Sequence, residues 1–124
     1  EILIQARDSD ALISIGVATA FSNNISLIAR NSIKIGEGCL LGDSVQIIDS
    51  DFHEIQPELR HVSSGGIAPV VIGNNVWLGS RVVVLKGVTI GENSVIAAGA
   101  VVCSNIPMNV IAGGVPAKVL RDLG

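Results

Sequence analysis

The chain has 124 residues, a length typical of one domain, with a net charge of −3 and 48% hydrophobic residues, only 2% of the chain being aromatic. No stretch approaches the roughly 18 uninterrupted apolar residues that a membrane-spanning helix needs. The scattered lysines and arginines form no basic patch, so neither membrane insertion nor nucleic-acid binding is expected.

Hydrophobic residues recur about every six positions from the N-terminal part onward, as Ile15, Phe21, Leu27, Ile35, Leu41 and Ile47. A hexapeptide period is typical of a parallel β-helix, in which one inward side chain per repeat stacks on the next coil. A helix would place apolar residues at i, i+3, i+4 and i+7, and a sandwich would show longer alternating strands. We therefore predict an all-β parallel β-helix that spans residues 1–124 as one domain.

The repeat stops over residues 48–70, and this segment contains both histidines of the chain, His53 and His61. An insertion in a solenoid forms a loop on one face, often the binding face. A loop of this length inside a compact domain is usually functional or disordered. We predict a candidate binding loop here, with one helical turn over residues 57–60.

After the loop the repeat resumes without a gap, and we predict inward side chains at Ile72, Leu78, Val84, Ile90, Ile96 and Val102. The C-terminal segment, residues 107–124, leaves the repeat, and we expect a short helix near residues 117–123. Cys39 and Cys103 make no disulfide framework and are expected to be small buried residues. Because no secretory leader is visible either, we expect a cytoplasmic protein.

Four motifs follow one another in the chain: Asp-Ser-Asp-Phe-His at 49–53, Ile-Gly-Asn-Asn-Val-Trp-Leu-Gly at 72–79, Lys-Gly-Val-Thr-Ile-Gly at 86–91 and Gly-Gly-Val-Pro-Ala-Lys-Val at 113–119. Over about residues 15–123 the chain resembles the hexapeptide-repeat acyltransferases, and within them the maltose and galactoside O-acetyltransferases. The resemblance implies a left-handed β-helix, whereas general sterics favour right-handed parallel crossovers. It also implies a homotrimer with sites between subunits.

The implied reaction moves an acetyl group from acetyl-CoA to a hydroxyl of a sugar or a similar small molecule. A neutral hydroxyl needs a base to take its proton, and histidine titrates in the right range. By resemblance His53 is that base, and the backbone N–H of Ser80 stabilises the oxyanion. Asp49 and Asp51 are candidates to orient the imidazole, or are solvated acids or strand-end caps. His61 is expected to be an ordinary loop histidine.

The resemblance places the CoA-binding residues at Trp77, Gly79, Ala98, Gly99, Lys118 and Arg121. Small residues at 98 and 99 leave room for the pantetheine arm, and the two cations suit the phosphates. For Trp77, an outward aromatic at a subunit contact is an equal alternative. Relatives often have Thr-Lys at positions 103–104, where this chain has Cys-Ser and therefore lacks one cation. No metal is expected.

By resemblance, the polar contacts to the acceptor are expected at Ser22, Asn23, Asn24 and Asp51. Related sugar acetyltransferases usually carry an N-terminal helical segment that helps close the acceptor pocket, and none precedes Ile15 here. Two alternatives therefore stay open: N-acylation of a nucleotide-sugar amine or an antibiotic, and a non-catalytic or truncated β-helix scaffold. A zinc hydratase is discounted, because its site needs three histidines and the chain has two.

Overall fold

The computed structural model describes residues 1–124 and contains fifteen short strands and one 3-10 turn. In chain order these are β1 (Ile2–Ala6), β2 (Leu12–Ile15), β3 (Ala20–Phe21), β4 (Ile25–Ala29), β5 (Ser32–Ile35), β6 (Leu40–Leu41), β7 (Gln46–Ile48), η1 (Pro57–Leu59), β8 (Val70–Ile72), β9 (Trp77–Leu78), β10 (Val83–Val84), β11 (Thr89–Ile90), β12 (Val95–Ile96), β13 (Val101–Val102), β14 (Val110–Gly114) and β15 (Ala117–Asp122). The turn η1 confirms the predicted helical turn in the loop.

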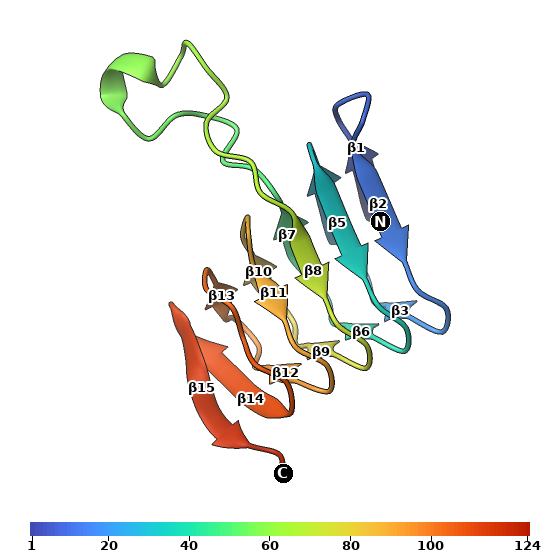
Figure 1. Cartoon of the computed structure of the whole chain (residues 1–124). Helices are drawn as coiled ribbons and strands as arrows, with labels where there is room; N and C mark the ends of the chain where they lie inside the picture. The colour runs from blue at the N-terminus through green and yellow to red at the C-terminus, as the bar shows by residue number, and fades with distance from the viewer.

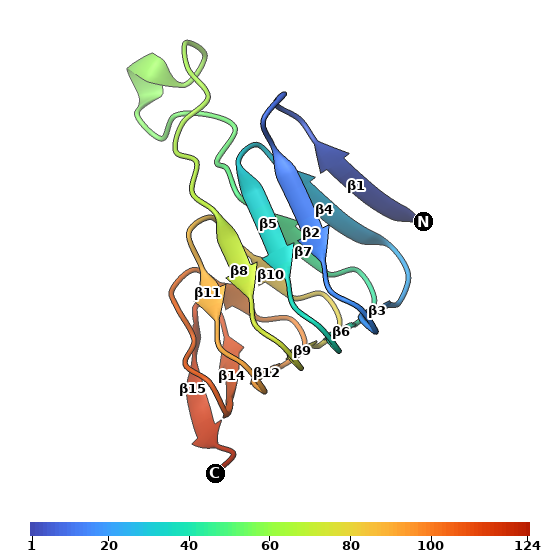
Figure 2. The same cartoon turned by 45° about the vertical axis from the view of Figure 1, so that its right-hand side comes forward.

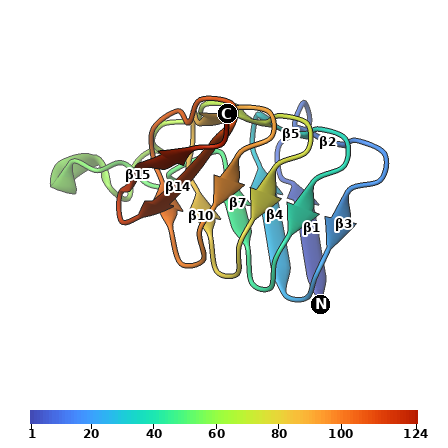
Figure 3. The same ribbon diagram turned by 90° about the horizontal axis from the view of Figure 1, so that it is seen from below.

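The strands form three sheets that run along the solenoid. The first sheet has the order β1-β4-β7-β10-β13, the second β11-β8-β5-β2 and the third β15-β14-β12-β9-β6-β3. Figure 2 shows the second sheet, and Figure 3 shows strands of the first sheet side by side. All strand pairings are parallel except that of β14 with β15. The predicted parallel β-solenoid is confirmed.

The core consists of the inward side chains of successive coils. All six predicted inward residues are buried: Ile72, Leu78, Val84, Ile90, Ile96 and Val102. Strand register stacks them in three rows, one in each sheet: Val84 pairs with Val102, Ile72 with Ile90, and Leu78 with Ile96. Each row therefore buries apolar surface against the coils on either side, which stabilises the stack.

The corner between the second and third sheets repeats one backbone conformation. Gly38, Asn75, Asn93 and Asn109 all adopt a left-handed conformation there, and so does Ala18 with φ 60°. Glycine and asparagine tolerate this region better than other residues. The Asn75 amide donates to the Oδ1 of Asn93 (3.0 Å), and the Asn93 amide donates to that of Asn109 (2.8 Å).

Two predictions are wrong. Residues 117–122 form strand β15 instead of a helix, because β14 offers an open edge that β15 pairs with in the antiparallel sense. Cys103 is exposed, since it follows the inward Val102 by one position and turns outward; Cys39 is buried as predicted. No helix in the structure has the length and apolar character needed to cross a membrane.

Candidate active site

The long loop leaves the solenoid at the corner between the first and second sheets, after β7, and returns to β8 (Figure 1). Its two arms pair at the root through an antiparallel bridge between Ser50 and Ile67, and the Asp51 N–H donates to the Gly66 carbonyl (3.0 Å). The Asp49 carboxylate is fully buried and accepts the backbone N–H groups of Arg30 (2.8 Å) and Asn31 (2.7 Å). The loop root is therefore fixed to the body of the solenoid.

His53 lies just beyond this root and is exposed to solvent. Its Nδ1 is 3.3 Å from the backbone carbonyl oxygen of Arg60. A carbonyl oxygen only accepts hydrogen bonds, so in the neutral ring Nδ1 must carry the proton. The Nε2 lone pair is then free to take a proton from a bound molecule. His61 is also exposed but makes no hydrogen bond within the chain.

Asp49 and Asp51, the two acids predicted to orient the His53 ring, form no hydrogen bond with it. The Asp49 carboxylate accepts hydrogen bonds from the backbone N–H groups of Arg30 and Asn31. The Asp51 Oδ2 forms an ion pair with the Lys86 ammonium at 3.1 Å. The ring contacts the Arg60 carbonyl oxygen instead, through Nδ1. A backbone carbonyl has no residue signature, so nothing in the sequence identifies this partner.

Four predicted residues meet at the corner between the third and first sheets, which we call the Ser80 corner. The Gly99 N–H donates to the Ser80 carbonyl at 2.9 Å, and a Cβ on Gly79 would lie only 2.8 Å from the Ala98 nitrogen. The backbone N–H groups of Ser80 and Ala98 donate to no acceptor in the chain. The backbone N–H of Asp43, at the same corner one coil earlier, also has no acceptor. The free N–H donors therefore lie in a row along this corner of the solenoid.

Trp77 lies on the outer face of the third sheet and is 51% exposed. Strand register places it between Leu40 and Val95, so the three side chains form an outward apolar row. Lys118 and Arg121 are exposed on β15 at one end of the same sheet, and neither forms an ion pair. This face therefore combines apolar surface, free backbone donors at its edge and free cations.

The predicted acceptor residues are divided between two places. Ser22, Asn23 and Asn24 are exposed at the Ser80 corner, in the coil nearest the N-terminus. A shallow hollow beside Asn24 is lined by Glu1, Leu3, Asn24, Ile25 and Ser26. Asp51 lies at the root of the loop. No three His, Cys, Asp or Glu side chains gather where they could hold a metal ion.

One chain does not bring the two halves of the predicted site together. The His53 loop projects from the corner between the first and second sheets, and Trp77 lies on the third sheet, opposite that corner (Figures 1 and 2). The candidate base and the Ser80 corner are thus on different edges of the same solenoid. Within a single chain the two groups of predicted site residues are therefore separate.

The sequence and the fold are similar to those of known proteins. Residues 69–104 match the family model described as bacterial transferase hexapeptide, six repeats. The galactoside O-acetyltransferase of Escherichia coli K12 is 42% identical over 100 residues, which cover 81% of this chain and 49% of that protein. The chain spans about half the length of the curated relatives that match it first.

Two solved structures show the same fold. A hexapeptide-repeat acetyltransferase of Vibrio cholerae, complexed with acetyl coenzyme A, superposes with a TM-score of 0.86 at 37% identity and covers 90% of this chain and 61% of that one. A maltose O-acetyltransferase of Clostridium difficile superposes with a TM-score of 0.79 at 32% identity and covers 100% of this chain and 67% of that one.

Proposed function

We propose that this chain, which belongs to the bacterial hexapeptide-repeat transferase family, moves an acetyl group from acetyl-CoA to a hydroxyl of a sugar or a similar small molecule. The similarity to a galactoside and a maltose O-acetyltransferase supports a sugar hydroxyl as the acceptor. The similarity to a structure complexed with acetyl coenzyme A supports the donor. We also propose a cytoplasmic location, in keeping with two free cysteines.

The observation that carries the proposal is the 3.3 Å contact between His53 Nδ1 and the Arg60 carbonyl oxygen, at an exposed ring on the inserted loop. Because Nδ1 donates to the Arg60 carbonyl, Nε2 is the basic nitrogen. Nε2 takes the proton of the acceptor hydroxyl while the hydroxyl oxygen attacks the thioester carbonyl carbon. The resulting imidazolium then returns the proton to the sulfur of CoA as the carbon–sulfur bond breaks, so His53 ends the cycle neutral.

The Ser80 corner is proposed to bind the thioester end of acetyl-CoA. The negative charge that develops on the carbonyl oxygen needs a donor already in place, and the Ser80 N–H has no acceptor of its own. The pantetheine arm is proposed to run past Gly79, Ala98 and Gly99, where small residues leave the backbone accessible. Lys118 and Arg121 then meet the phosphates, and Trp77 contacts the acyl end.

We propose that the complete site forms between two copies of the chain in a homotrimer. One copy supplies His53, and its neighbour supplies the Ser80 corner and Trp77. The separation of these groups within one chain supports this arrangement, as does the outward apolar row in which Leu40 and Trp77 are exposed and Val95 is half-buried. Cyclic symmetry closes such an interface and repeats the site three times.

The proposal is tested with a thiol-release assay, using acetyl-CoA and a panel of sugar, nucleotide-sugar amine and antibiotic acceptors. His53→Ala should lower turnover by about 10²–10⁴-fold, the usual contribution of a positioned base, and should leave CoA binding nearly unchanged. His61→Ala is the matched control and should do far less. Full activity of both variants would contradict a histidine base, and activity on amines alone would exclude O-acetylation.

A further inference from the structure

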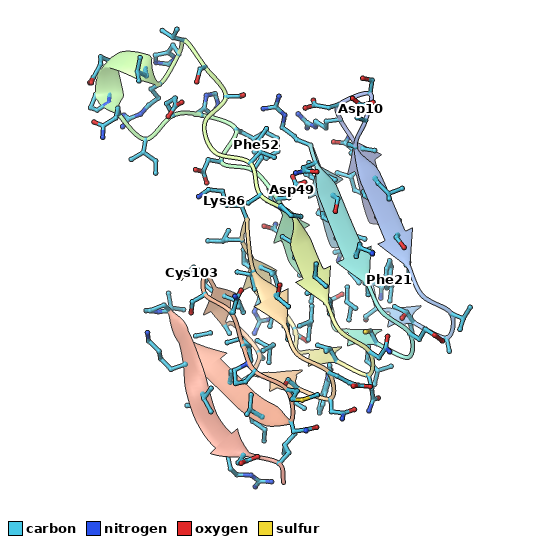
Figure 4. The ribbon with its side chains drawn as sticks, viewed as in Figure 1. Asp10, Phe21, Asp49, Phe52, Lys86 and Cys103 are labelled. Atoms are coloured by element: carbon cyan, nitrogen blue, oxygen red, sulfur yellow. The ribbon has the colours of Figure 1, made fainter.

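The ion pair between Lys86 and Asp51 connects the loop root to a different coil of the solenoid. Lys86 lies in the corner after β10, and Asp51 lies two residues before His53. The Lys86 Nζ is 3.1 Å from the Asp51 Oδ2, and both side chains are about one-third exposed. Figure 4 shows Lys86 beside the base of the loop, with Asp49 and Phe52 nearby.

Resting on the proposed function of His53, we propose that Lys86 is a positioning residue: its ion pair with Asp51 sets the direction in which the His53 ring points. An ion pair at this exposure contributes little to the stability of a fold. We expect the ion pair to act instead on the orientation of the loop segment that carries His53, because a small difference in free energy is enough to select one orientation of a loop.

Phe52 transmits the position of Asp51 to His53. It adopts a left-handed conformation with φ 67°, which is uncommon for a bulky residue and persists only where the surroundings enforce it. Its N–H donates to the Ser50 Oγ at 3.1 Å, and the Arg7 guanidinium lies 5.3 Å from the centre of its ring. The Ser50 hydrogen bond fixes the Phe52 backbone, and Arg7 fixes the Phe52 ring. Because Phe52 therefore has little freedom to absorb a displacement of Asp51, that displacement rotates the backbone at His53.

Gly66 on the returning arm of the loop supports the same assignment. A Cβ at this position would lie 2.8 Å from the Lys86 Cε and 3.4 Å from the Asp51 Oδ2. The absence of a side chain at Gly66 therefore leaves the space through which the Lys86 stem reaches Asp51. Three residues on three segments thus meet at one contact.

The test first reverses the charge at Lys86 and then exchanges the charges of Lys86 and Asp51. Lys86→Glu should lower the turnover number by about 10- to 100-fold without weakening acetyl-CoA binding, because a displacement of about 1 Å is costly to an aligned base. The double variant Asp51→Lys/Lys86→Glu restores the pair and should recover turnover to within about threefold. Lys34→Glu is the matched control: it makes the same charge change on an exposed lysine without an ion pair, and turnover should stay unchanged.

The exchange also separates two roles for Asp51. If Asp51 bound the acceptor directly, the double variant would stay as inactive as Lys86→Glu, and this result would overturn the proposal. Unchanged turnover in Lys86→Glu would also overturn it. Where Lys86→Glu does not fold, as judged by circular dichroism, Lys86→Met takes its place and should show a smaller loss of the same kind.

Nitrogen-15 spectra of histidine-labelled protein give a readout that does not depend on activity. The wild-type chain should show the Nδ1-protonated form of His53, and Lys86→Glu should show an increased share of the Nε2-protonated form. An unchanged tautomer in Lys86→Glu overturns the positioning role even if His53 is the base. Full activity of His53→Ala would overturn the proposed function. The change of tautomer in Lys86→Glu would still show whether the Lys86–Asp51 ion pair positions the His53 ring.

Discussion

Gly65 lies directly against the backbone of His53, with no room for a side chain between them. A Cβ on Gly65 would collide with the His53 carbonyl group, and the residue has φ +76°. Gly65→Ala should therefore shift His53 and lower turnover by about 10-fold or more. Gly38→Ala is the control, since Gly38 has φ +66° and a Cβ added there would meet nothing within 4 Å. Both variants should lose about 1 kcal/mol of stability in urea unfolding from the strain of a left-handed alanine, and Gly65→Ala should lose more because of its collision with His53. Equal turnover in the two would contradict the contact.

Asp49 ties the loop to the solenoid through two charge-assisted hydrogen bonds. Asp49→Ala leaves the part-buried N–H groups of Arg30 and Asn31 without their acceptor, and should lower the free energy of unfolding by about 1–3 kcal/mol. Asp49→Asn keeps one acceptor oxygen and should lose about half as much. Urea unfolding measures both. Glu92→Ala is the control, because it removes an exposed carboxylate that makes no hydrogen bond, and it should change the free energy of unfolding little. A loss in Glu92→Ala as large as that in Asp49→Ala would show that the two hydrogen bonds are not the cause.

Ala18 is the one alanine at a left-handed corner position, where the next coils have Gly38, Asn75, Asn93 and Asn109. Ala18→Asn should raise the free energy of unfolding by about 0.5–1 kcal/mol, because asparagine is less strained in this conformation. Ala20→Asn, in β3 with ordinary strand geometry, is the control and should give no gain. Thermal unfolding compares the two, and an equal gain at both positions would exclude relief of backbone strain.

The cations of β15 should contribute to acetyl-CoA affinity and not to the chemical step. The double variant Lys118→Ala/Arg121→Ala should weaken binding of CoA about tenfold, measured by calorimetry, and leave turnover at saturating acetyl-CoA nearly unchanged. Raising the salt concentration should weaken binding to the wild type more than to the variant, because screening acts on the removed charges. Lys34→Ala is the control. Unchanged CoA affinity in the double variant would place the phosphates elsewhere.

Assembly is tested in two steps. Light scattering at micromolar concentration should give about three times the 12.8 kDa chain mass, and a monomer mass would contradict the trimer. Co-expression of His53→Ala with Ala98→Trp should raise activity well above that of either variant alone, because mixed trimers contain sites with an intact base from one copy and an intact Ser80 corner from the next. No recovery in mixed trimers would show that each chain completes its own site.

The sequence predicts those parts of the molecule that depend on repetition. The hexapeptide period identifies the six inward positions from Ile72 to Val102 that it predicts, because equivalent positions of successive repeats occupy the same kind of environment. It fails at the C-terminal end, where residues 117–122 become a strand only through pairing with β14, a contact that local pattern does not encode. In the candidate site, the position of His53 on the loop follows from the interrupted repeat. The Arg60 carbonyl, the Lys86 ion pair and the steric role of Gly65 depend on the path of the loop and could not be predicted.

The same loop also affects how the chain folds. Most neighbouring coils pair residues that are close in sequence, as Val84 does with Val102. Across the loop, Val84 pairs with Ile47, about twice that sequence separation. Doubling a closed loop adds roughly 0.6 kcal/mol of entropy cost, so growth of the solenoid should pause between β7 and β10. The joining of the first coils to the last coils is then the step that the inserted loop slows, by about threefold.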